Sequence, residues 1–249
     1  MPGLLAIDVG NTQTALGLYE GAELARHWRL ATEPQRTGDE LGLFLGGLLD
    51  LETLDGICLA STVPSLIRSY EELAAGVGVQ LLALGPGTRT GIPIRYDDPR
   101  EVGPDRIANA VAAYDLYGGP TIIVDFGTAT TCDAVSANGE YLGGAIAPGI
   151  EISMDALVGR AAALRAVELR EPRHVLGKST VESIQSGAVY GFAAQVDGLC
   201  DRIQDSLGPC TVVSTGGLAD LISPLSKRIE HSEPWLTLHG LRLVYEKNA

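Results

Sequence analysis

Two short loops of the chain combine an aspartate with a glycine turn and small polar residues. The first is Asp8-Val9-Gly10-Asn11-Thr12, and the second is Asp125-Phe126-Gly127-Thr128-Ala129. Each follows a continuous apolar run, which predicts a buried strand ending in a tight turn. Glycine lets the backbone approach a ligand closely, and the N–H groups of such a turn can bind an anion. We therefore interpret the two loops as binding sites for nucleotide phosphates.

The aspartates in these loops need a different role, because a carboxylate and a phosphate repel each other. Asp8 and Asp125 can instead hold a hydrated magnesium ion or a monovalent cation that bridges to the phosphates. Hydroxyl and amide groups nearby can add hydrogen bonds, and these belong to Asn11, Thr12, Thr14, Thr128, Thr130 and Thr131. A single Asp-x-Gly triplet is more often a plain turn after a strand, so only the repetition favours phosphate binding.

A third group of residues places an acid and a base side by side where a helix is expected to begin. The segment is Gly103-Pro104-Asp105-Arg106, and the helix is predicted over residues 105–117. Asp105 can accept the proton of an alcohol during phosphoryl transfer. Arg106 can bind a carboxylate or phosphate in fork geometry. An acid in the first turn of a helix also commonly serves only to offset the helix dipole, and this alternative stays open.

The elements that must position these residues repeat along the chain. Asp125 lies 117 residues after Asp8, and the hairpin turn Asn138-Gly139 lies 118 residues after Glu20-Gly21. Each half thus begins with a strand, an Asp-x-Gly turn, a strand, a hairpin and a strand. We predict an internal duplication, with an N-terminal domain over residues 1–117 and a C-terminal domain over residues 118–249.

Further elements follow in each half. A capping box, Thr37-Gly38-Asp39-Glu40, predicts a helix that runs toward Leu49, and Pro64 predicts the start of another. The remaining predicted strands cover residues 56–60, 80–84, 211–214 and the neighbourhood of 228. The remaining predicted helices cover residues 150–164 and 181–207 and a final stretch from 238.

Composition excludes several classes of protein. Eighteen basic residues against 31 acidic ones give a net charge of −13, which makes nucleic acid an unfavourable partner. No uncharged apolar run reaches ~18 residues, and the start of the chain has no secretion signature, so we expect a cytoplasmic protein without a membrane span. The four cysteines, Cys58, Cys132, Cys200 and Cys210, form no CxxC pair and are expected to be buried thiols.

Paired Asp-x-Gly hairpins at this separation resemble the actin, sugar-kinase and heat-shock-chaperone superfamily. The P-loop and Rossmann motifs are absent from the sequence. The resemblance implies an α/β fold of duplicated actin-like (ribonuclease H-like) domains, each a mixed five-stranded sheet flanked by helices, with the active site in the interdomain cleft. Thr215-Gly216-Gly217 resembles the adenosine loop of that superfamily.

A narrower resemblance extends essentially from end to end. The chain looks like a type III pantothenate kinase by four motifs in order: Asp8-Val9-Gly10-Asn11-Thr12, Glu101-Val102-Gly103-Pro104-Asp105-Arg106, Asp125-Phe126-Gly127-Thr128-Ala129-Thr130-Thr131 and Gly143-Gly144-Ala145-Ile146-Ala147-Pro148-Gly149. The segment Gly177-Lys178-Ser179-Thr180 also fits. The resemblance implies transfer of the ATP γ-phosphate to the terminal hydroxyl of pantothenate, which gives 4'-phosphopantothenate in the first step of coenzyme A biosynthesis. It also implies a homodimer.

The same resemblance implies roles for individual residues. ATP would contact Asp8, Val9, Gly10, Asn11, Thr12, Gln13, Thr14, Ala15, Thr128, Gly216 and Gly217. Pantothenate would contact Tyr96, Gly103, Pro104, Asp105, Arg106 and, from across a dimer interface, Thr180. Asp105 would be the proton acceptor. Asp125 would bind a potassium or ammonium ion, and Asp8 a magnesium ion through water. Pro104 stands where the family has alanine. The proline should stiffen the turn, and it leaves the neighbouring aspartate in place.

Two other functions fit the same fold. One is an ATP-binding regulatory protein without kinase activity, and the pairing of Asp105 with Arg106 argues against it because a sensor needs no base. The other is an actin-like or chaperone-like assembly protein, and the short chain leaves little room for the extra domains that this function requires.

Overall fold

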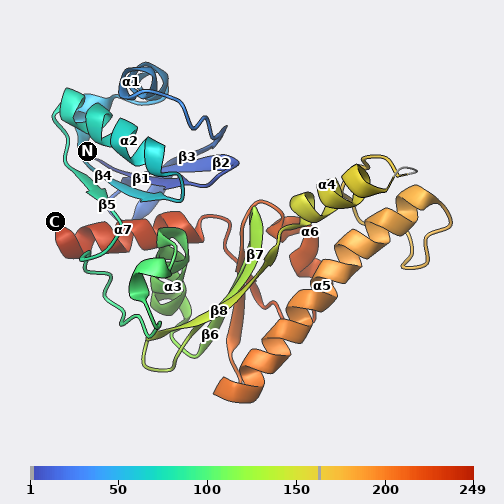
Figure 1. Ribbon diagram of the computed structural model, residues 1–249. Helices are drawn as coiled ribbons and strands as arrows, with labels where there is room; N and C mark the ends of the chain where they lie inside the picture. The colour runs from blue at the N-terminus through green and yellow to red at the C-terminus, as the bar shows by residue number, and fades with distance from the viewer. Residues whose placement is uncertain (1–2, 162–163) are drawn as a thin grey trace. The chain divides into compact units, whose positions relative to one another are not determined.

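The computed structural model describes residues 3–161 and 164–249 and forms two compact units (Figure 1). The first unit contains Met1–Ala112 together with Leu236–Ala249, and the second contains Ala113–Trp235. Each unit has its own five-stranded sheet. The domain division predicted from the sequence, between residues 117 and 118, groups the C-terminal segment with the second half, whereas the structure groups it with the first.

The first sheet has the strand order β3-β2-β1-β4-β5. β1 is antiparallel to β2, β2 is antiparallel to β3, and β4 and β5 run parallel to β1. The strands are β1 (Gly3–Val9), β2 (Gln13–Glu20), β3 (Glu23–Ala31), β4 (Leu54–Ser61) and β5 (Leu81–Ala83).

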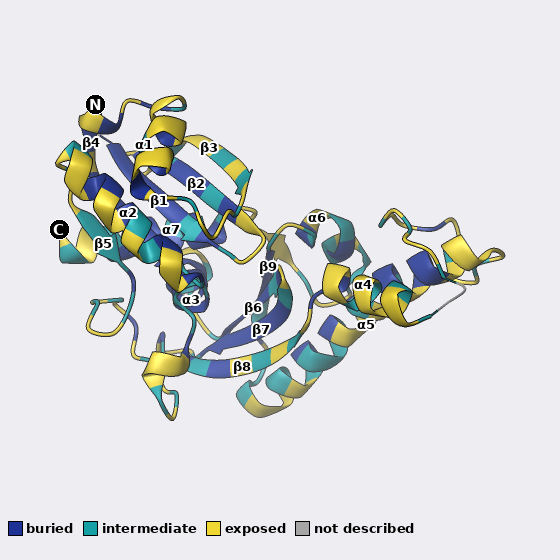
Figure 2. Ribbon diagram, turned by 45° about the horizontal axis from the view of Figure 1, so that its top comes forward, coloured by how far each residue is buried: buried dark blue, intermediate teal, exposed yellow. Residues whose placement is uncertain are grey.

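Helices α1 (Gly38–Gly46) and α2 (Pro64–Val77) belong to the core on one face of this sheet. The capping box is present: Glu40 N donates to Thr37 Oγ1 over 3.3 Å, and Thr37 N donates to Glu40 Oε2 over 2.8 Å. Apolar side chains from the sheet and both helices form one cluster, which includes Leu5, Ile7, Val9, Leu16, Leu41, Leu45, Leu66 and Leu73. Figure 2 shows this buried layer in dark blue.

The C-terminal helix α7 (Leu236–Asn248) packs against β1, β2 and β4 of the first sheet. Its buried apolar side chains include Leu238, Leu241 and Val244. A methyl group at Gly17 of β2 would lie 2.9 Å from Leu238 Cδ1, so glycine allows the close approach. A hydrophobic period shows that a helix has a buried face but does not show which sheet it covers.

The second sheet has the order β8-β7-β6-β9-β10, and its pattern repeats that of the first. β6, β7 and β8 form antiparallel pairs, and β9 and β10 run parallel to β6. The strands are β6 (Thr121–Phe126), β7 (Ala129–Val135), β8 (Tyr141–Pro148), β9 (Thr211–Thr215) and β10 (His231–Ser232). The predicted duplication of mixed five-stranded sheets is confirmed, and the strand expected near residue 228 lies at 231–232.

The remaining helices connect or cover these sheets. They are α3 (Pro104–Tyr117), α4 (Ile150–Arg160), α5 (Thr180–Leu207) and α6 (Ala219–Ile222), with short 3-10 turns at Leu51–Thr53, Pro99–Glu101 and Ser223–Leu225. α5 contributes Ala188, Val189, Ala193 and Val196 to the second core, where they join Ile122, Val124 and Phe126 of β6. The helix predicted over 150–164 ends at Arg160, and residues 162–163 lie outside the described residues.

Among the helices of residues 3–161 and 164–249, none is long and apolar enough to cross a membrane.

Candidate active site

The Asp8 loop (residues 8–15) joins β1 to β2. Gly10 N donates to Gln13 O over 3.0 Å and closes the turn. The side chains at the tip, those of Asn11, Thr12 and Gln13, are exposed, and Asp8 is half-buried at the base. A methyl group at Gly10 would lie 3.0 Å from Gln13 O, which is tighter than an ordinary contact. The loop therefore presents a solvent-exposed turn of small and polar residues with a carboxylate at its base.

Side chains behind the Asp8 loop, half-buried in the case of Thr32 and buried in the case of Thr14, hold its shape. Thr32 Oγ1 donates to Gly10 O over 2.8 Å, and Thr32 N donates to Thr12 O over 3.0 Å. The hydroxyls of Thr14 and Thr32 are 2.8 Å apart, and Thr14 must be the donor because Thr32 has only one hydroxyl hydrogen. Val9 is fully buried in the core. The side chains of Thr14 and Val9 thus support the turn, and their predicted contacts with ATP stay a prediction.

The Asp125 loop (residues 125–131) joins β6 to β7 and has one residue fewer in its turn. Gly127 N donates to Ala129 O over 3.1 Å. Behind the turn, Gly149 N donates to Thr128 O over 3.1 Å, and a methyl group at Gly149 would lie 2.6 Å from Gly127 O. The junction of β8 and α4 therefore fixes the backbone of the Asp125 loop, while the Thr128 side chain stays exposed.

The glycine turn after β9 packs directly on Asp125. Gly216 has a φ of 97°, and a methyl group there would lie 2.5 Å from Asp125 Oδ1 and 2.6 Å from Phe126 N. Leu218 N donates to Phe126 O over 3.3 Å. The structure thus brings Gly216 and the exposed Gly217 beside Asp125, in a cradle that a side chain on Gly216 would fill.

Hydroxyl groups stand on both strands that neighbour Asp125. Thr131 of β7 and Thr215 of β9 are its partners in the strand register. Thr131 Oγ1 donates to Asp133 Oδ2 over 3.2 Å, and Tyr141 OH donates to Asp133 Oδ1 over 2.8 Å. Carboxylate and hydroxyl oxygens are the ligands that hard cations prefer, so the predicted monovalent cation fits the residues present.

Sequence reasoning did not find Asp133 or Tyr141. Asp133 is fully buried in β7 and Tyr141 is fully buried in β8. The sequence did hold one indication of a functional role for Asp133, because an ionisable residue stands there inside an otherwise uncharged strand. Carboxylates are rarely buried unless they are paired or hydrogen-bonded.

Asp105 lies in the first turn of α3. Its Oδ1 accepts the N–H of Arg106 over 2.9 Å, and a methyl group at Gly103 would lie 2.5 Å from the same oxygen. Gly103 O accepts the N–H of Ile107 over 3.2 Å. Pro104 is the first helical residue, where a missing N–H costs nothing. These contacts give the carboxylate a defined, half-buried position, and Arg106 is only 7% exposed.

Tyr96 lies half-buried in the long connection between β5 and α3. The C-terminal helix anchors this connection, because Arg89 N donates to Asn248 Oδ1 over 3.2 Å and Asn248 Nδ2 donates to Arg89 O over 2.9 Å. Nearer to α3, Arg100 binds Asp98 through two hydrogen bonds of 2.9 and 2.8 Å. The side chain and backbone N–H of Arg100 lower the pKa of Asp98.

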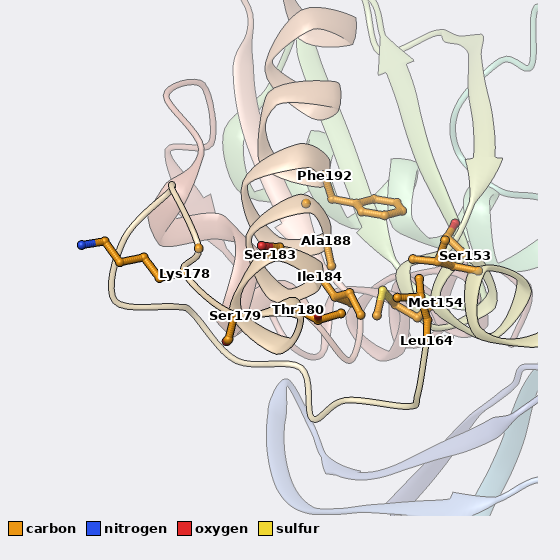
Figure 3. Close-up of a pocket in the computed structure, with 13 residues that line it drawn as sticks. Ser153, Met154, Leu164, Lys178, Ser179, Thr180, Ser183, Ile184, Ala188 and Phe192 are labelled. Atoms are coloured by element: carbon orange, nitrogen blue, oxygen red, sulfur yellow. The ribbon is translucent and has the colours of Figure 1, made fainter. Parts of the chain in front are cut away.

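Thr180 is the first residue of α5, next to the N-cap Ser179, whose hydroxyl accepts the N–H of Glu182 over 3.2 Å. It lines a cavity of about 810 Å³ between α4 and α5 (Figure 3). The lining also includes polar groups near the start of α5 and Ser153 of α4. Its apolar side chains include Met154, Leu157, Leu164, Ile184, Ala188 and Phe192. In Figure 3 the Lys178 side chain extends away from the cavity.

The cysteines are buried free thiols, as expected. Burial raises the pKa of Cys58, Cys132 and Cys200 to about 12, which keeps these thiols protonated and unreactive at neutral pH. No group of three or more His, Cys, Asp or Glu side chains suited to a metal ion occurs within the described part of the chain. A magnesium ion at Asp8 would therefore depend on phosphate oxygens and water for most of its ligands.

Comparison with known families decides which chemistry this arrangement serves. A family model described as type III pantothenate kinase matches residues 4–202. The chain belongs to the type III pantothenate kinase family. It is 53% identical to a type III pantothenate kinase of Streptomyces coelicolor, over 99% of this chain and 98% of that one. It is 55% identical to one of Moorella thermoacetica, over 99% of this chain and all of that one.

Solved structures support the fold. An inorganic polyphosphate/ATP-glucomannokinase from Arthrobacter sp. strain KM has a TM-score of 0.57 at 13% identity, with all of both chains covered. Component A of an (R)-2-hydroxyglutaryl-CoA dehydratase from Acidaminococcus fermentans has a TM-score of 0.59 at 14% identity, again over both whole chains. At these identities the likeness concerns the fold alone. Membership of the family makes the chain a kinase of coenzyme A biosynthesis whose substrates are pantothenate and ATP.

Proposed function

We propose that this pantothenate kinase transfers the γ-phosphate of ATP to the terminal hydroxyl of pantothenate with Asp105 as the general base. The observation that carries the assignment is the defined position of the Asp105 carboxylate, between Gly103 and the N–H of Arg106 at the start of α3. A carboxylate held by backbone contacts can take the proton of an alcohol as the oxygen attacks phosphorus. When bound, ATP with its divalent metal supplies the phosphoryl group and neutralises its charge.

The Asp8 loop is proposed to bind the ATP phosphates. Its exposed tip accepts hydrogen bonds from Thr32, whose hydroxyl in turn accepts one from Thr14, and we infer that these bonds preorganise the turn. A preorganised turn loses little conformational entropy when an anion binds. The half-buried Asp8 would hold magnesium through water, at the base of the turn.

The Asp125 loop is proposed to hold the monovalent cation, potassium or ammonium. Support comes from the oxygen groups beside the Asp125 carboxylate and from the cradle formed by Gly216. A cation there would offset the charge between the carboxylate and a phosphate. Thr128, Gly216 and Gly217 would contact ATP on the exposed side of this loop.

Pantothenate is proposed to contact Tyr96 and the segment Gly103–Arg106. The guanidinium of Arg106 suits the carboxylate of pantothenate, because its N–H groups match a carboxylate in a two-bond fork. Pro104 and Gly103 would shape the backbone wall of this site. Thr180 is proposed to complete it from a second subunit.

A homodimer would account for the apolar side chains that are exposed on α4 and around the start of α5. Five large apolar side chains there are exposed by 42 to 83%: Ile152, Leu157, Val175, Leu176 and Val181. Contiguous exposed apolar surface commonly marks an interaction site. We propose that a second copy covers it and carries Thr180 into the partner's substrate site. Sedimentation should show a dimer for the wild type and a monomer for Leu176→Asp, and a monomeric active wild type would contradict the proposal.

The enzyme is proposed to work in the cytoplasm. Its four cysteines are reduced and buried, which suits a reducing compartment.

The test of the function is a coupled ADP-release assay with pantothenate, magnesium and potassium. The account predicts pantothenate-dependent ADP release by the wild type and a loss of about 10²–10⁴-fold in kcat for Asp105→Asn, since general-base catalysis contributes that much. ATP binding by Asp105→Asn, measured by titration calorimetry, should stay near the wild-type value. ATP binding without pantothenate-dependent turnover would instead favour a regulatory protein of the same fold.

A further inference from the structure

Asp125 differs from Asp8 in having hydroxyl side chains at the paired positions of both neighbouring strands. Residues paired across neighbouring strands share a face of the sheet, and in antiparallel pairs such as β6 and β7 they lie about 4.5–5.5 Å apart at Cβ. Asp125 is paired with Thr131 on one side and Thr215 on the other. Both neighbours carry a hydroxyl group on the face that carries the Asp125 carboxylate.

The side chains at the same positions around Asp8 contain no oxygen. Asp8 is paired with Ala15 in β2 and Ala60 in β4. Further along β2 stands Gly17, paired with Ala6, and the matching pair in the second sheet is Asp133 with Ile123. Next to the aspartate, the second sheet therefore presents side-chain oxygens where the first sheet presents alanine and glycine.

Asp133 fixes the hydroxyl of Thr131. Thr131 Oγ1 donates to Asp133 Oδ2 over 3.2 Å, and the other carboxylate oxygen accepts the Tyr141 hydroxyl over 2.8 Å. Asp133 has no exposed surface, and Thr131 is 9% exposed. A methyl group at Gly144 of β8 would lie 2.7 Å from Asp133 Oδ1, so the packing also confines this carboxylate.

The hydrogen bond to Asp133 determines what the Thr131 oxygen can do. A hydroxyl has one hydrogen and two lone pairs. Because the hydrogen points to Asp133, the oxygen can offer only lone pairs to a group beside Asp125. Two electron-rich groups on adjacent strands repel each other, and a cation between them converts the repulsion into attraction.

We propose that Thr131 Oγ1 is a ligand of the monovalent cation and that Asp133 is the positioning residue that aims its lone pairs at that cation. This inference rests on the proposed cation-binding role of Asp125. Partners that orient a metal ligand from behind commonly matter for affinity almost as much as the ligand itself.

The experiment measures the melting temperature of the full chain against potassium concentration, with tetramethylammonium chloride keeping the ionic strength constant. Thr131→Val keeps the side-chain shape and removes the oxygen. We expect the potassium concentration for half the stabilisation to rise by at least about 10–100-fold, because that factor is commonly lost when only a partner behind a metal ligand is removed. Thr131→Ser should restore a value close to the wild type. A folded Thr131→Val protein with wild-type potassium dependence would overturn the ligand role.

Asp133→Asn tests the positioning role. Hydrogen bonds to a charged acceptor are roughly twice as strong as those between neutral groups, so the amide should hold the Thr131 hydroxyl less firmly. We expect a rise in the half-saturating potassium concentration that is smaller than that of Thr131→Val. Unchanged potassium dependence in Asp133→Asn, beside a shifted Thr131→Val, would overturn the positioning role.

Two further variants separate this inference from its foundation. Tyr141→Phe removes the hydroxyl that donates to the other carboxylate oxygen of Asp133 and leaves Thr131 unchanged. It should therefore lower the melting temperature and keep the potassium dependence. Asp125→Ala should abolish the potassium response. If Asp125→Ala keeps the response, the proposed cation site is wrong and the inference fails with it. If Asp125→Ala loses the response and Thr131→Val does not, the inference alone fails.

Discussion

In the first sheet the residue opposite Val9 is Thr14, and in the second the residue opposite Phe126 is Thr130. Both threonines are buried next to an Asp-x-Gly turn. The Thr14 hydroxyl bonds to Thr32, whereas the buried Thr130 hydroxyl has no hydrogen-bond partner in the described part of the chain. The same residue at the same place therefore supports one loop and contributes no bond to the other.

The two sheets differ more strongly on the other face of these strands, the face that carries Asp8 in the first sheet and Asp125 in the second. Next to Asp8 the neighbouring strands present alanine, and next to Asp125 they present threonine. Behind Asp125 stands Gly216, and the corresponding residue after Ala60 is Ser61. The duplicated fold thus keeps the order strand, Asp-x-Gly turn, strand at both loops, although the second turn is one residue shorter. We propose that the side chains on one face determine which ion or phosphate each loop can hold.

The largest stability effect is expected from filling the cradle behind Asp125. Gly216→Ala places a methyl group 2.5 Å from Asp125 Oδ1 at a φ of 97°. We expect a loss of about 2–5 kcal/mol in the free energy of unfolding, from the left-handed backbone and overpacking together. Urea unfolding measures it.

Gly208→Ala is the matched control for this variant. Gly208 has a φ of 83° and nothing within 4 Å of an added methyl group, so it isolates the backbone contribution. With a ψ of −172°, Gly208 lies in a region that essentially only glycine populates, so the cost should be about 1–3 kcal/mol. Equal costs for the two variants would show that Gly216 makes no special contact with Asp125.

The next effect is expected from the bonded threonine. Thr14→Val removes the donor to Thr32 and keeps the side-chain shape, and we expect a loss of about 0.5–1.5 kcal/mol, the net worth of one hydrogen bond. Thermal or urea unfolding measures it. A stability equal to the wild type would show that the hydroxyl pair does not hold the Asp8 loop.

The smallest effect is expected from the unbonded threonine. Thr130→Val removes a buried hydroxyl that makes no hydrogen bond, so the protein should keep its stability or gain up to about 1 kcal/mol. The same unfolding assay applies. A clear loss of stability would mean that the Thr130 hydroxyl has a partner, and the contrast between the two threonines would disappear.

Much of the fold could be predicted from the sequence because the decisive patterns are local. The capping box at Thr37 sets the start of α1, and the helix predicted over 181–207 matches α5 (Thr180–Leu207). The hairpin turns and the two Asp-x-Gly loops also lie where the apolar runs and the glycine-containing turns predict them. The two-residue strand β10 carries little pattern of its own, and its predicted position was wrong by a few residues.

The rest depends on contacts between distant parts of the chain. Thr32 closes the Asp8 loop from the end of β3, and Gly216 reaches Asp125 across a strand pair. α7 returns to the first sheet although its sequence fits either sheet. The role proposed for Asp133 depends on the hydroxyls of Thr131 and Tyr141 that donate to its carboxylate. The proposed roles of the candidate site residues rest on the resemblance to the family, and variants at these residues test them.

The central claim is that the Asp8 loop binds magnesium and phosphate and the Asp125 loop binds the monovalent cation. Its most direct test compares Asp8→Asn with Asp125→Asn. Titration calorimetry would measure ATP binding with magnesium at several potassium concentrations. The account predicts that Asp125→Asn binds ATP with an affinity that no longer depends on potassium, whereas Asp8→Asn keeps the potassium dependence and loses the magnesium dependence. A potassium dependence that survives in Asp125→Asn, or disappears in Asp8→Asn, would contradict it.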